Sequence, residues 1–498
     1  MTKAERADEV AVLVAGAGPA GLTAAITLAR YGVATLLVER RTELSGLPRA
    51  ASVSIRTMER LRSWGLEDEV RAGGVDVDWR EWVGDTLLGP GQALATSFPT
   101  REQALVLSPT GPASVPQDHL EPVLLRYLRS FPGVRVEFGT ELVALDSKAH
   151  GVDAVLSDVA TGRTRTVRAR FVVAADGIRS RARQLLGIGL RGPAQLSSAI
   201  ATLFRAPLWE LLGERRHFIY AITHPEAAGV FVPAGRGDRW TYGVEFPAGP
   251  APIAEYTPDR VTELIRLGTG VADLAPRIER IGAFSFAAQL AERFRSASTF
   301  LVGDAAHRVT PRGGTGMNTA IQGAHDLGWK LAWVLRGWAA PSLLDSYEAE
   351  FRPAAEHNVR RSADPDGSAR GVDQELHVDL GARIPHLWCA TPAGRLSTID
   401  LVGAGLTLFL GPAGERWRAA AASLPTVVPW AVHRLDAVTA RGLGIGPRGA
   451  LLARPDGAPA GAWPCDTDAE LSLRTAVAAL TTGAGSPAGS SPALSDVA

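Results

Sequence analysis

The amino-terminal part of the chain alternates between continuous apolar runs and apolar residues at helical spacing. Val10 to Ala15 is an unbroken apolar run, which is typical of a parallel strand covered on both faces. Pro19 to Tyr31 has apolar residues at helical spacing, Gly32 ends that helix, and Ala34 to Glu39 is again apolar. The pattern predicts a strand, a helix and a second strand, which together form the βαβ unit of a doubly wound sheet.

The spacing changes further along the chain. Between 196 and 286, apolar and polar residues alternate with Pro and Gly between the runs, which predicts an inserted antiparallel sheet. Alternating runs over 134–173 predict a smaller antiparallel excursion, after which 171–175 returns to the main sheet. Helices are expected over 54–64, 117–131, 258–267, 318–338 and 343–359, with a strand over 299–302.

These patterns predict an α/β protein with a Rossmann-like lobe, an inserted antiparallel-sheet lobe and a carboxy-terminal domain of strands and short helices. The polar, turn-rich segment 362–371 is expected to be a linker. We expect the first lobe to comprise 1–195 and 287–361, the antiparallel lobe 196–286, the third domain 373–482, and a disordered tail 483–498.

Composition excludes several kinds of partner. The 498 residues have a formal net charge of zero, so we expect no surface for nucleic acid or an anionic membrane. Cys389 and Cys465 are the only cysteines and form no CxxC pair, which argues against a disulfide framework, a structural zinc site or another metal. The charged residues 1–9 lead straight into a strand and no apolar stretch could span a bilayer, so we expect a cytoplasmic protein without signal peptide or membrane anchor.

A glycine-rich turn joins the first strand to its helix. Gly16 allows the tight turn, Gly18 lets the backbone approach phosphate oxygens, and Gly21 lets the helix pack against the strand. Glu39 closes the second strand, where an acceptor for adenosine ribose hydroxyls belongs. The alternative is a glycine-rich turn with a surface acid. A second match to the motif, over 444–449, leads into a strand instead of a helix, so we expect no nucleotide there.

Two later motifs stand at the ends of further apolar strands. Asp176 and Gly177 follow one strand, and Asp304 follows another, where its carboxylate can accept from a sugar hydroxyl. A helix cap is the simpler interpretation of Asp304 alone. The run 311–318 is rich in glycine and leads into a helix, so that its backbone N–H groups can lie against a flat ring. The three motifs in this order predict FAD.

The motif order resembles that of the class A flavoprotein monooxygenases, which include p-hydroxybenzoate hydroxylase, phenol hydroxylase and the aromatic polyketide hydroxylases. The resemblance implies that Gln117 reaches the ribityl chain, that Arg49 lies near pyrophosphate and NADPH, that Arg40 belongs to an E-R pair, and that Leu142 borders adenine. The cofactor-binding residues that we expect are Gly16, Gly18, Pro19, Ala20, Gly21, Glu39, Arg40, Arg49, Gln117, Leu142, Asp176, Asp304, Pro311, Gly314, Thr315, Gly316, Met317 and Asn318.

Three positions depart from the family's pattern. Ala175 replaces a frequent Cys before the D-G pair, which we expect to be neutral. Gly323 and Ala324 stand where an acid-containing pair is common, and Thr315 replaces a frequent Gln. These last two departures can alter how flavin or substrate is seated.

The resemblance also implies the chemistry. Non-covalent FAD would be reduced by NADPH or NADH, O2 would add at C4a, and the resulting hydroperoxyflavin would hydroxylate a polycyclic aromatic, such as a polyketide or another secondary metabolite. In the polyketide-hydroxylase branch the third domain is thioredoxin-like; because it lacks CxxC here, we interpret it as structural. The protein is expected to be a monomer or homodimer.

Substrate contacts are weakly determined by sequence. The antiparallel lobe should cover the flavin, and its candidate residues are His217, Tyr220, Phe231, Trp240 and Tyr242. Most aromatic residues on such strands belong to the core, so for each of the five the core interpretation is favoured over substrate contact. No catalytic base can be named, and His307 is interpreted as a packed residue. Baeyer–Villiger insertion or epoxidation on the same scaffold, a non-oxygenating dehydrogenase or oxidase, and a cofactor-free relative remain alternatives.

Overall fold

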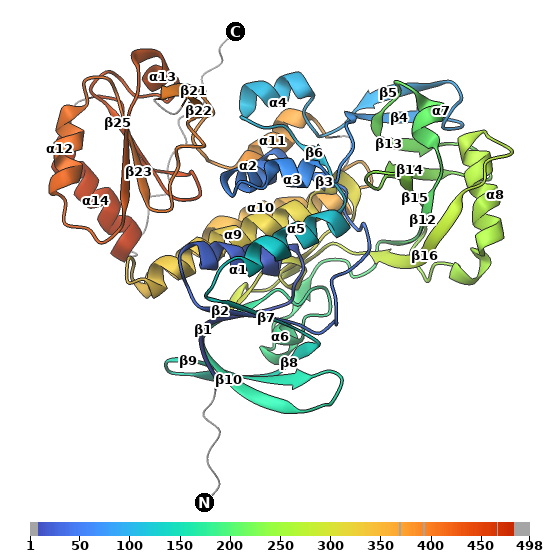
Figure 1. The fold of residues 1–498 in the computed structure, drawn as a ribbon, viewed down its shortest axis with the longest axis horizontal. Helices are drawn as coiled ribbons and strands as arrows, with labels where there is room; N and C mark the ends of the chain where they lie inside the picture. Colours follow the sequence, from blue (N-terminus) through green and yellow to red (C-terminus); the bar gives the residue numbers. More distant parts are fainter. Residues whose placement is uncertain (1–7, 368–369, 392–393, 466, 483–498) are drawn as a thin grey trace, which may run out of the picture. The chain divides into compact units, whose positions relative to one another are not determined.

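The chain forms two compact units. The computed structural model describes residues 8–367, 370–391, 394–465 and 467–482, so the predicted tail 483–498 lies outside the described residues. The first unit contains the nucleotide-binding motifs and the antiparallel lobe, and the second contains the carboxy-terminal domain (Figure 1). By residue number, the first comprises 1–104, 110–324 and 352–379, and the second 105–109, 325–351 and 380–498.

The main sheet of the first unit is built around parallel strands. Its strands run in the order β18-β19-β10-β1-β2-β7, and β8 and β9 extend it from β10. Helix α1 (Pro19–Arg30) connects β1 to β2, which confirms the predicted βαβ unit, and α1 packs beside α5 (Gln117–Arg129). The strands are β1 (Asp8–Ala15), β2 (Thr35–Glu39), β7 (Val134–Phe138), β8 (Thr140–Lys148), β9 (Gly151–Asp158), β10 (Thr164–Ala174), β18 (Arg295–Ser296) and β19 (Thr299–Leu301).

One strand differs from the sequence-based expectation. β7 was expected to belong to the antiparallel excursion, but it pairs in parallel with β2 and extends the main sheet. Only β8, β9 and the first part of β10 form the antiparallel excursion. Alternation reveals a strand but carries no information about the direction of its neighbour, which explains the difference.

The second sheet of this unit has seven strands in the order β16-β12-β15-β14-β13-β4-β5. Two of them, β4 and β5, precede the segment in which the antiparallel lobe was expected, and β4 pairs in parallel with β13. Helix α8 (Pro258–Thr269) lies along one side of the sheet (Figure 1). The strands are β4 (Asp78–Gly84), β5 (Gly91–Ala95), β12 (Ser197–Arg205), β13 (His217–Ile222), β14 (Gly229–Pro233), β15 (Arg239–Phe246) and β16 (Arg277–Phe286).

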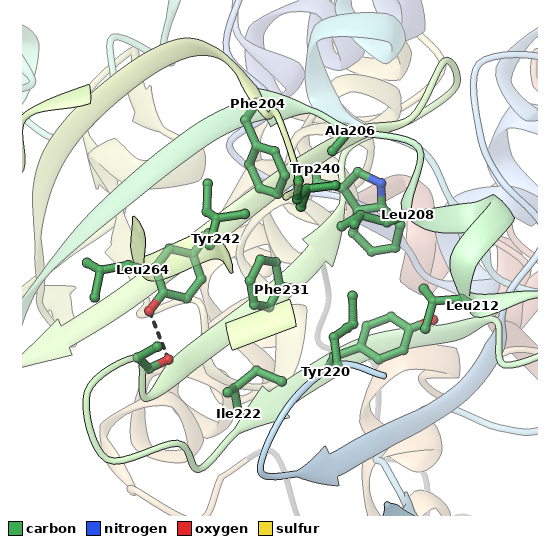
Figure 2. Packing of buried hydrophobic residues seen from close by; sticks show 14 of the residues in the cluster. Phe204, Ala206, Leu208, Leu212, Tyr220, Ile222, Phe231, Trp240, Tyr242 and Leu264 are labelled. Carbon is green, nitrogen blue, oxygen red and sulfur yellow. Dashed lines mark hydrogen bonds between the residues drawn. The ribbon is translucent and has the colours of Figure 1, made fainter. Parts of the chain in front are cut away.

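Large aromatic side chains fill the core on the α8 side of this sheet (Figure 2). Phe231 and Tyr242 lie with ring centroids 4.7 Å apart, and Trp209 and Trp240 with centroids 4.5 Å apart. Val261, Leu264 and Ile265 supply the apolar stripe of α8 that covers them. Burying residues of this size excludes water from the middle of this face of the sheet.

The second unit contains a mixed four-stranded sheet in the order β24-β23-β25-β26. β23 (Leu406–Leu410) pairs in parallel with β24 (Trp430–Arg434) and antiparallel with β25 (Ala450–Ala453), and β26 (Pro459–Trp463) completes the sheet. Helices α12 (Glu415–Ser423) and α14 (Ala469–Thr482) pack together beside it. The α/β class is therefore confirmed, with two large sheets in the first unit and a four-stranded sheet in the carboxy-terminal unit.

The two free cysteines are placed differently in this second unit. Cys389 is buried and Cys465 is exposed. Burial raises the pKa of the Cys389 thiol, which disfavours the reactive thiolate.

Long helices and short elements complete the fold. α9 (Gly316–Leu335) follows the glycine-rich loop, and α10 (Ser346–Ala363) runs into the segment expected as a linker, where Ser362 is fully buried. No described helix has both the length and the apolar character needed to cross a membrane. The remaining elements include α2 (Ile55–Ser63), α3 (Glu67–Arg71), α4 (Arg101–Leu107), α6 (Arg181–Leu185), α7 (Leu208–Leu212), α11 (Val372–Leu380), α13 (Ala437–Gly442), β3 (Ser52–Val53), β6 (Ala113–Ser114), β11 (Leu190–Arg191), β17 (Gln289–Ala291), β20 (His307–Arg308), β21 (Trp388–Thr391) and β22 (Gly394–Ser397).

Candidate functional site

The glycines of the first turn have separate physical roles. Gly16 has φ +107°, and a Cβ atom there would lie 2.2 Å from the carbonyl oxygen of Ala175. A Cβ atom at Gly21 would lie 1.9 Å from the Gly16 carbonyl oxygen. At Gly18 no protein atom lies within 4 Å of the corresponding position. Two glycines thus allow close packing, while the third keeps the backbone bare beside open space at the start of α1, as a phosphate site requires.

Acidic and small residues line this turn. Glu39 ends β2, and its carboxylate accepts hydrogen bonds from the backbone N–H groups of Ala17 at 2.9 Å and Arg41 at 3.0 Å. Pro19 is the first residue of α1, and Ala20 faces Gly303, whose added Cβ would lie 2.9 Å from the Ala20 side chain. The turn and the end of β19 therefore lie next to each other.

Three other predicted cofactor contacts occupy distinct places. Arg40 is exposed after β2, and Leu142 is buried in β8. Asp176 is engaged locally: its carboxylate accepts from the Ser180 hydroxyl at 2.5 Å and from the Ala182 N–H at 2.9 Å, at the start of α6. This bonding accounts for Asp176 as a group that shapes the turn after β10, and its contact with FAD stays a prediction.

Asp304 lies at the end of β19 beside two arginines. Among the described residues, no group hydrogen-bonds to its carboxylate. Burial raises the pKa of Asp304, and the charges of Arg308 and Arg49 oppose that shift. A half-buried carboxylate without a hydrogen-bond donor is costly unless a ligand supplies one, and a ribityl hydroxyl fits that need.

Gln117 begins α5 directly opposite the segment that carries Arg49. Its backbone N–H donates to the carbonyl of Ala50 at 2.8 Å, and its side chain donates to Glu121 at 2.7 Å. Burial raises the pKa of Glu121 to about 7, while the Gln117 hydrogen bond and the charge of Arg49 act against it. Burial and the like charge of Arg41 lower the pKa of Arg49.

The loop 311–318 presents its backbone through two left-handed glycines. Pro311 precedes Gly313 (φ +76°) and Gly314 (φ +63°). Asn318 holds the loop: its side chain accepts from the Ser54 N–H at 2.9 Å and donates to the Gly314 carbonyl at 3.1 Å. The remaining members, half-buried Thr315, Gly316 and buried Met317, lead into α9.

A polar cavity of about 50 Å³ adjoins this loop. It is lined by Gly313, Gly314 and Thr315 on one side and by side chains of α9, α10 and α11 on the other. Asp379 accepts hydrogen bonds from Ser54 at 2.7 Å and Gln322 at 2.8 Å there. Sequence analysis missed this cavity because its charged residues are scattered through helices without a motif.

The predicted substrate aromatics lie on the closed face of the seven-stranded sheet. Tyr220, Phe231, Trp240 and Tyr242 are at most 1% exposed and belong to the core under α8 (Figure 2). The Tyr242 hydroxyl donates to the Ala227 carbonyl at 2.9 Å, and that of Tyr220 donates to the Arg215 carbonyl at 2.6 Å. Their hydroxyls are therefore already satisfied within the core.

His217 shares this environment. Its ring stacks on Trp82 with centroids 5.6 Å apart, and burial lowers its pKa against the opposing charge of Asp78. Four of the five candidates thus face the core, the favoured interpretation, and His217 packs against Trp82 beside it. Contact of these residues with substrate stays a prediction. Alternation separates two faces of a strand but does not tell which face is covered, and large aromatics fill a core most effectively.

The opposite face of the same sheet carries a row of half-buried residues. Hydrogen-bonded pairing brings one small or aliphatic residue from each of six adjacent strands into a single lateral row. This row, which we call the small-residue row, consists of Gly282, Ala201, Gly243, Val230, Ala221 and Val83. All six are partly accessible. Sequence reasoning missed them because small residues give no chemical signal.

A second group of three aromatic residues lies outside the cluster under α8, and one of them adjoins the glycine-rich loop. Trp79 and Phe98 lie with ring centroids 4.8 Å apart, and Phe218 lies 4.7 Å from Trp79. A Cβ atom added at Gly314 would lie 3.2 Å from the Phe98 ring. An aromatic wall therefore stands beside the loop.

Two family models together match most of this chain. A family model described as an FAD binding domain matches residues 9–362, and one described as the carboxy-terminal part of aromatic-ring hydroxylases matches 377–487. The aklavinone 12-hydroxylase of Streptomyces purpurascens is 36% identical over 94% of this chain and 97% of its own length. The tetracenomycin A2 monooxygenase-dioxygenase of Streptomyces glaucescens is 34% identical over 90% and 92%.

A solved structure shares the whole fold. The ternary complex of aklavinone-11 hydroxylase with FAD and aklavinone matches with a TM-score of 0.87 at 33% identity. The match covers 97% of this chain and 100% of that one.

Proposed function

Because the chain belongs to the family of FAD-dependent aromatic-ring hydroxylases, we propose that this flavoprotein monooxygenase uses NAD(P)H and O2 to hydroxylate a flat polycyclic phenol. The relatives named above are a hydroxylase of aklavinone and a monooxygenase of tetracenomycin A2, which supports a polyketide-like substrate. A cytoplasmic location and a monomeric or dimeric state remain predictions.

The small-residue row is the observation that carries the substrate class. Gly243 pairs with both Ala201 and Val230, so the middle of the open face has no large side chain. A fused ring system buries most of its surface by lying flat on such a face, at about 25 cal/mol per Å² of apolar area. A single phenol ring would cover only part of the row.

Several residues of this chain are positioned to hold FAD. Bound FAD would supply the redox chemistry that links NAD(P)H oxidation to transfer of one oxygen atom from O2 to the substrate. Gly18 and the start of α1 are positioned to bind its pyrophosphate, and Asp304 to accept from a ribityl hydroxyl. The backbone of Gly313 and Gly314 is positioned to contact the flavin ring, with Phe98 beside it. In this arrangement the aromatic wall and the open face of the sheet cover the reacting ring.

The experiment compares fused and single-ring phenols. The purified protein should be yellow, and NADPH oxidation should be stimulated by hydroxylated three- or four-ring compounds but little by monocyclic phenols. The product should gain the mass of one oxygen atom. Stimulation by single-ring phenols alone would contradict the proposed substrate class.

A substitution within the small-residue row provides the structural control. A Cβ atom added at Gly282 meets no protein atom within 4 Å, so Gly282→Val should fold while its side chain occupies the space above the row. We expect a raised KM for the fused-ring substrate. Gly133→Val is a matched control, because Gly133 is exposed, also has open space around it and lies in the main-sheet region. Equal KM values in the Gly282→Val and Gly133→Val variants would show that the small-residue row does not contact the substrate.

A further inference from the structure

Arg312 lies immediately before the two left-handed glycines of the flavin loop and reaches away from that loop. Its guanidinium group pairs with the Glu245 carboxylate at 2.6 Å and lies 5.5 Å from the centroid of the Phe286 ring. Glu245 is on β15 and Phe286 is on β16. A single side chain therefore joins the loop to two strands of the seven-stranded sheet.

The partner carboxylate is itself fixed. The Ser197 hydroxyl of β12 donates to the same Glu245 oxygen atom that Arg312 contacts, at 2.5 Å. Glu245 lies two residues beyond Gly243 on β15, so both side-chain positions belong to the open face of the sheet. The link thus connects the loop to the face that carries the small-residue row.

The loop is restrained from its other side as well. A Cβ atom added at Gly313 would lie 2.7 Å from the guanidinium carbon of Arg361, so that group packs directly against the loop. Arg361 in turn pairs with Glu375 at 2.9 Å and donates to the Gly367 carbonyl at 2.9 Å. Arg361 also donates to Ser97, beyond β5, and Phe98 links Gly314 to Trp79 of β4. The loop therefore has several contacts toward the sheet, and the Arg312 side chain adds the contact to β15 and β16.

We propose that Arg312, through Glu245 and Phe286, is a positioning residue that fixes the separation between the flavin loop and the substrate-facing side of the sheet. This inference rests on the proposed function. This separation decides whether a reacting carbon of the substrate lies within reach of the oxygen delivered at the flavin. Where the carbon is out of reach, that oxygen is lost as hydrogen peroxide. Misplacement of about 1 Å is enough to lower such transfer strongly.

Because the Arg312–Glu245 pair is partly exposed, its effect on the position of the loop can be measured separately from any effect on folding. The Arg312 and Glu245 side chains are 19% and 42% exposed, and ion pairs of this kind contribute little to global stability. Arg312→Gln and Glu245→Gln should therefore fold and bind FAD. Their effect should appear locally, as a loop that is less firmly held.

The test measures the bound flavin and the fate of oxygen in the FAD-loaded protein. Arg312→Gln and Glu245→Gln should each change the visible circular dichroism of bound FAD and increase flavin fluorescence. With a stimulating fused-ring phenol, the hydrogen peroxide released per NADPH should rise by up to about fivefold. An exposed ion pair can shift the equilibrium between a held and a released loop by about that factor. The double variant should show no more effect than either single one, and Arg312→Lys should recover part of the wild-type behaviour.

Glu279→Gln is the matched control. Glu279 pairs with Arg205 at 2.7 Å between β16 and β12 of the same sheet, but it does not touch the flavin loop. Its variant should match the wild-type protein in both flavin signals. If Arg312→Gln and Glu245→Gln also match the wild-type protein, the positioning role is wrong. A wild-type protein that transfers no oxygen while these variants still alter the flavin spectrum would instead overturn the proposed function.

Discussion

Asp304 is the residue whose surroundings depend most on a ligand. Its carboxylate is half-buried, lacks a hydrogen-bond donor among the described residues, and faces the charges of Arg308 and Arg49. A helix cap, the simpler interpretation of this position, would place a backbone N–H against the carboxylate. Because no such bond is present there, the sugar-hydroxyl interpretation is the better one.

Replacing Asp304 should weaken FAD binding without unfolding the protein. Asp304→Ala removes a charge-assisted hydrogen bond, which should cost about 1.5–3 kcal/mol of FAD binding energy. The dissociation constant of FAD, measured by titrating the FAD-free protein, should rise accordingly. Asp304→Asn keeps an acceptor oxygen and should lose less. An unchanged dissociation constant in Asp304→Ala would exclude the residue from the site.

At the scale of elements, the strand–turn–helix unit separates packing from ligand binding. Gly21→Ala should destabilise the fold, because its Cβ would lie 1.9 Å from the Gly16 carbonyl oxygen. Gly18→Ala meets no protein atom within 4 Å and should leave the melting temperature of the FAD-free protein nearly unchanged while reducing FAD affinity. Thermal melting and FAD titration of both variants distinguish the roles. A Gly18→Ala protein with full FAD affinity would argue against a phosphate at this turn.

The start of α5 should give the protein a characteristic dependence on pH. Burial raises the pKa of Glu121 to about 7, so the folded protein retains a proton that the unfolded chain releases near pH 4.5. Stability from this group is complete below that lower value and is lost as pH rises through about 7. The loss is up to about 3 kcal/mol.

Glu121→Gln checks this dependence directly. The variant cannot ionise at this position, so its urea midpoint should fall less between pH 4.5 and pH 7.5 than that of the wild-type protein, whose Glu121 has a pKa of about 7. The two proteins should be compared at one fixed FAD concentration. Parallel pH profiles would mean that Glu121 ionises normally in the folded state.

Sequence periodicity predicted most helices and strands because the spacing of apolar residues within each element depends only on that element's own conformation. β1, α1 and β2 agree with the predicted ranges to within about two residues. The direction of β7 and the addition of β4 and β5 to the seven-stranded sheet could not be predicted, because strand pairing is decided by residues distant in the chain. For the same reason sequence identified the glycine turn and Asp304 but not the Arg312–Glu245 contact.

At the scale of the whole molecule, the face of the seven-stranded sheet proposed to bind substrate also depends on pairing between distant strands, which the sequence does not reveal. Aromatic residues such as Phe231 and Trp240 were candidate substrate contacts in the sequence, and they fill the core under α8. The open face is made of residues such as Gly243 and Ala221, which are informative only once pairing places them in one row. Family membership therefore gives the chemistry, and the sheet register gives the expected shape of the substrate.

The central claim is that this protein transfers an oxygen atom from O2 to a fused-ring substrate. Turnover under 18O2 with NADPH and a stimulating polycyclic phenol tests it most directly. We expect one labelled atom in the product and the other in water, measured by mass spectrometry of both. A substrate that is oxidised without any label in the product would contradict the account and identify the protein as a dehydrogenase or oxidase.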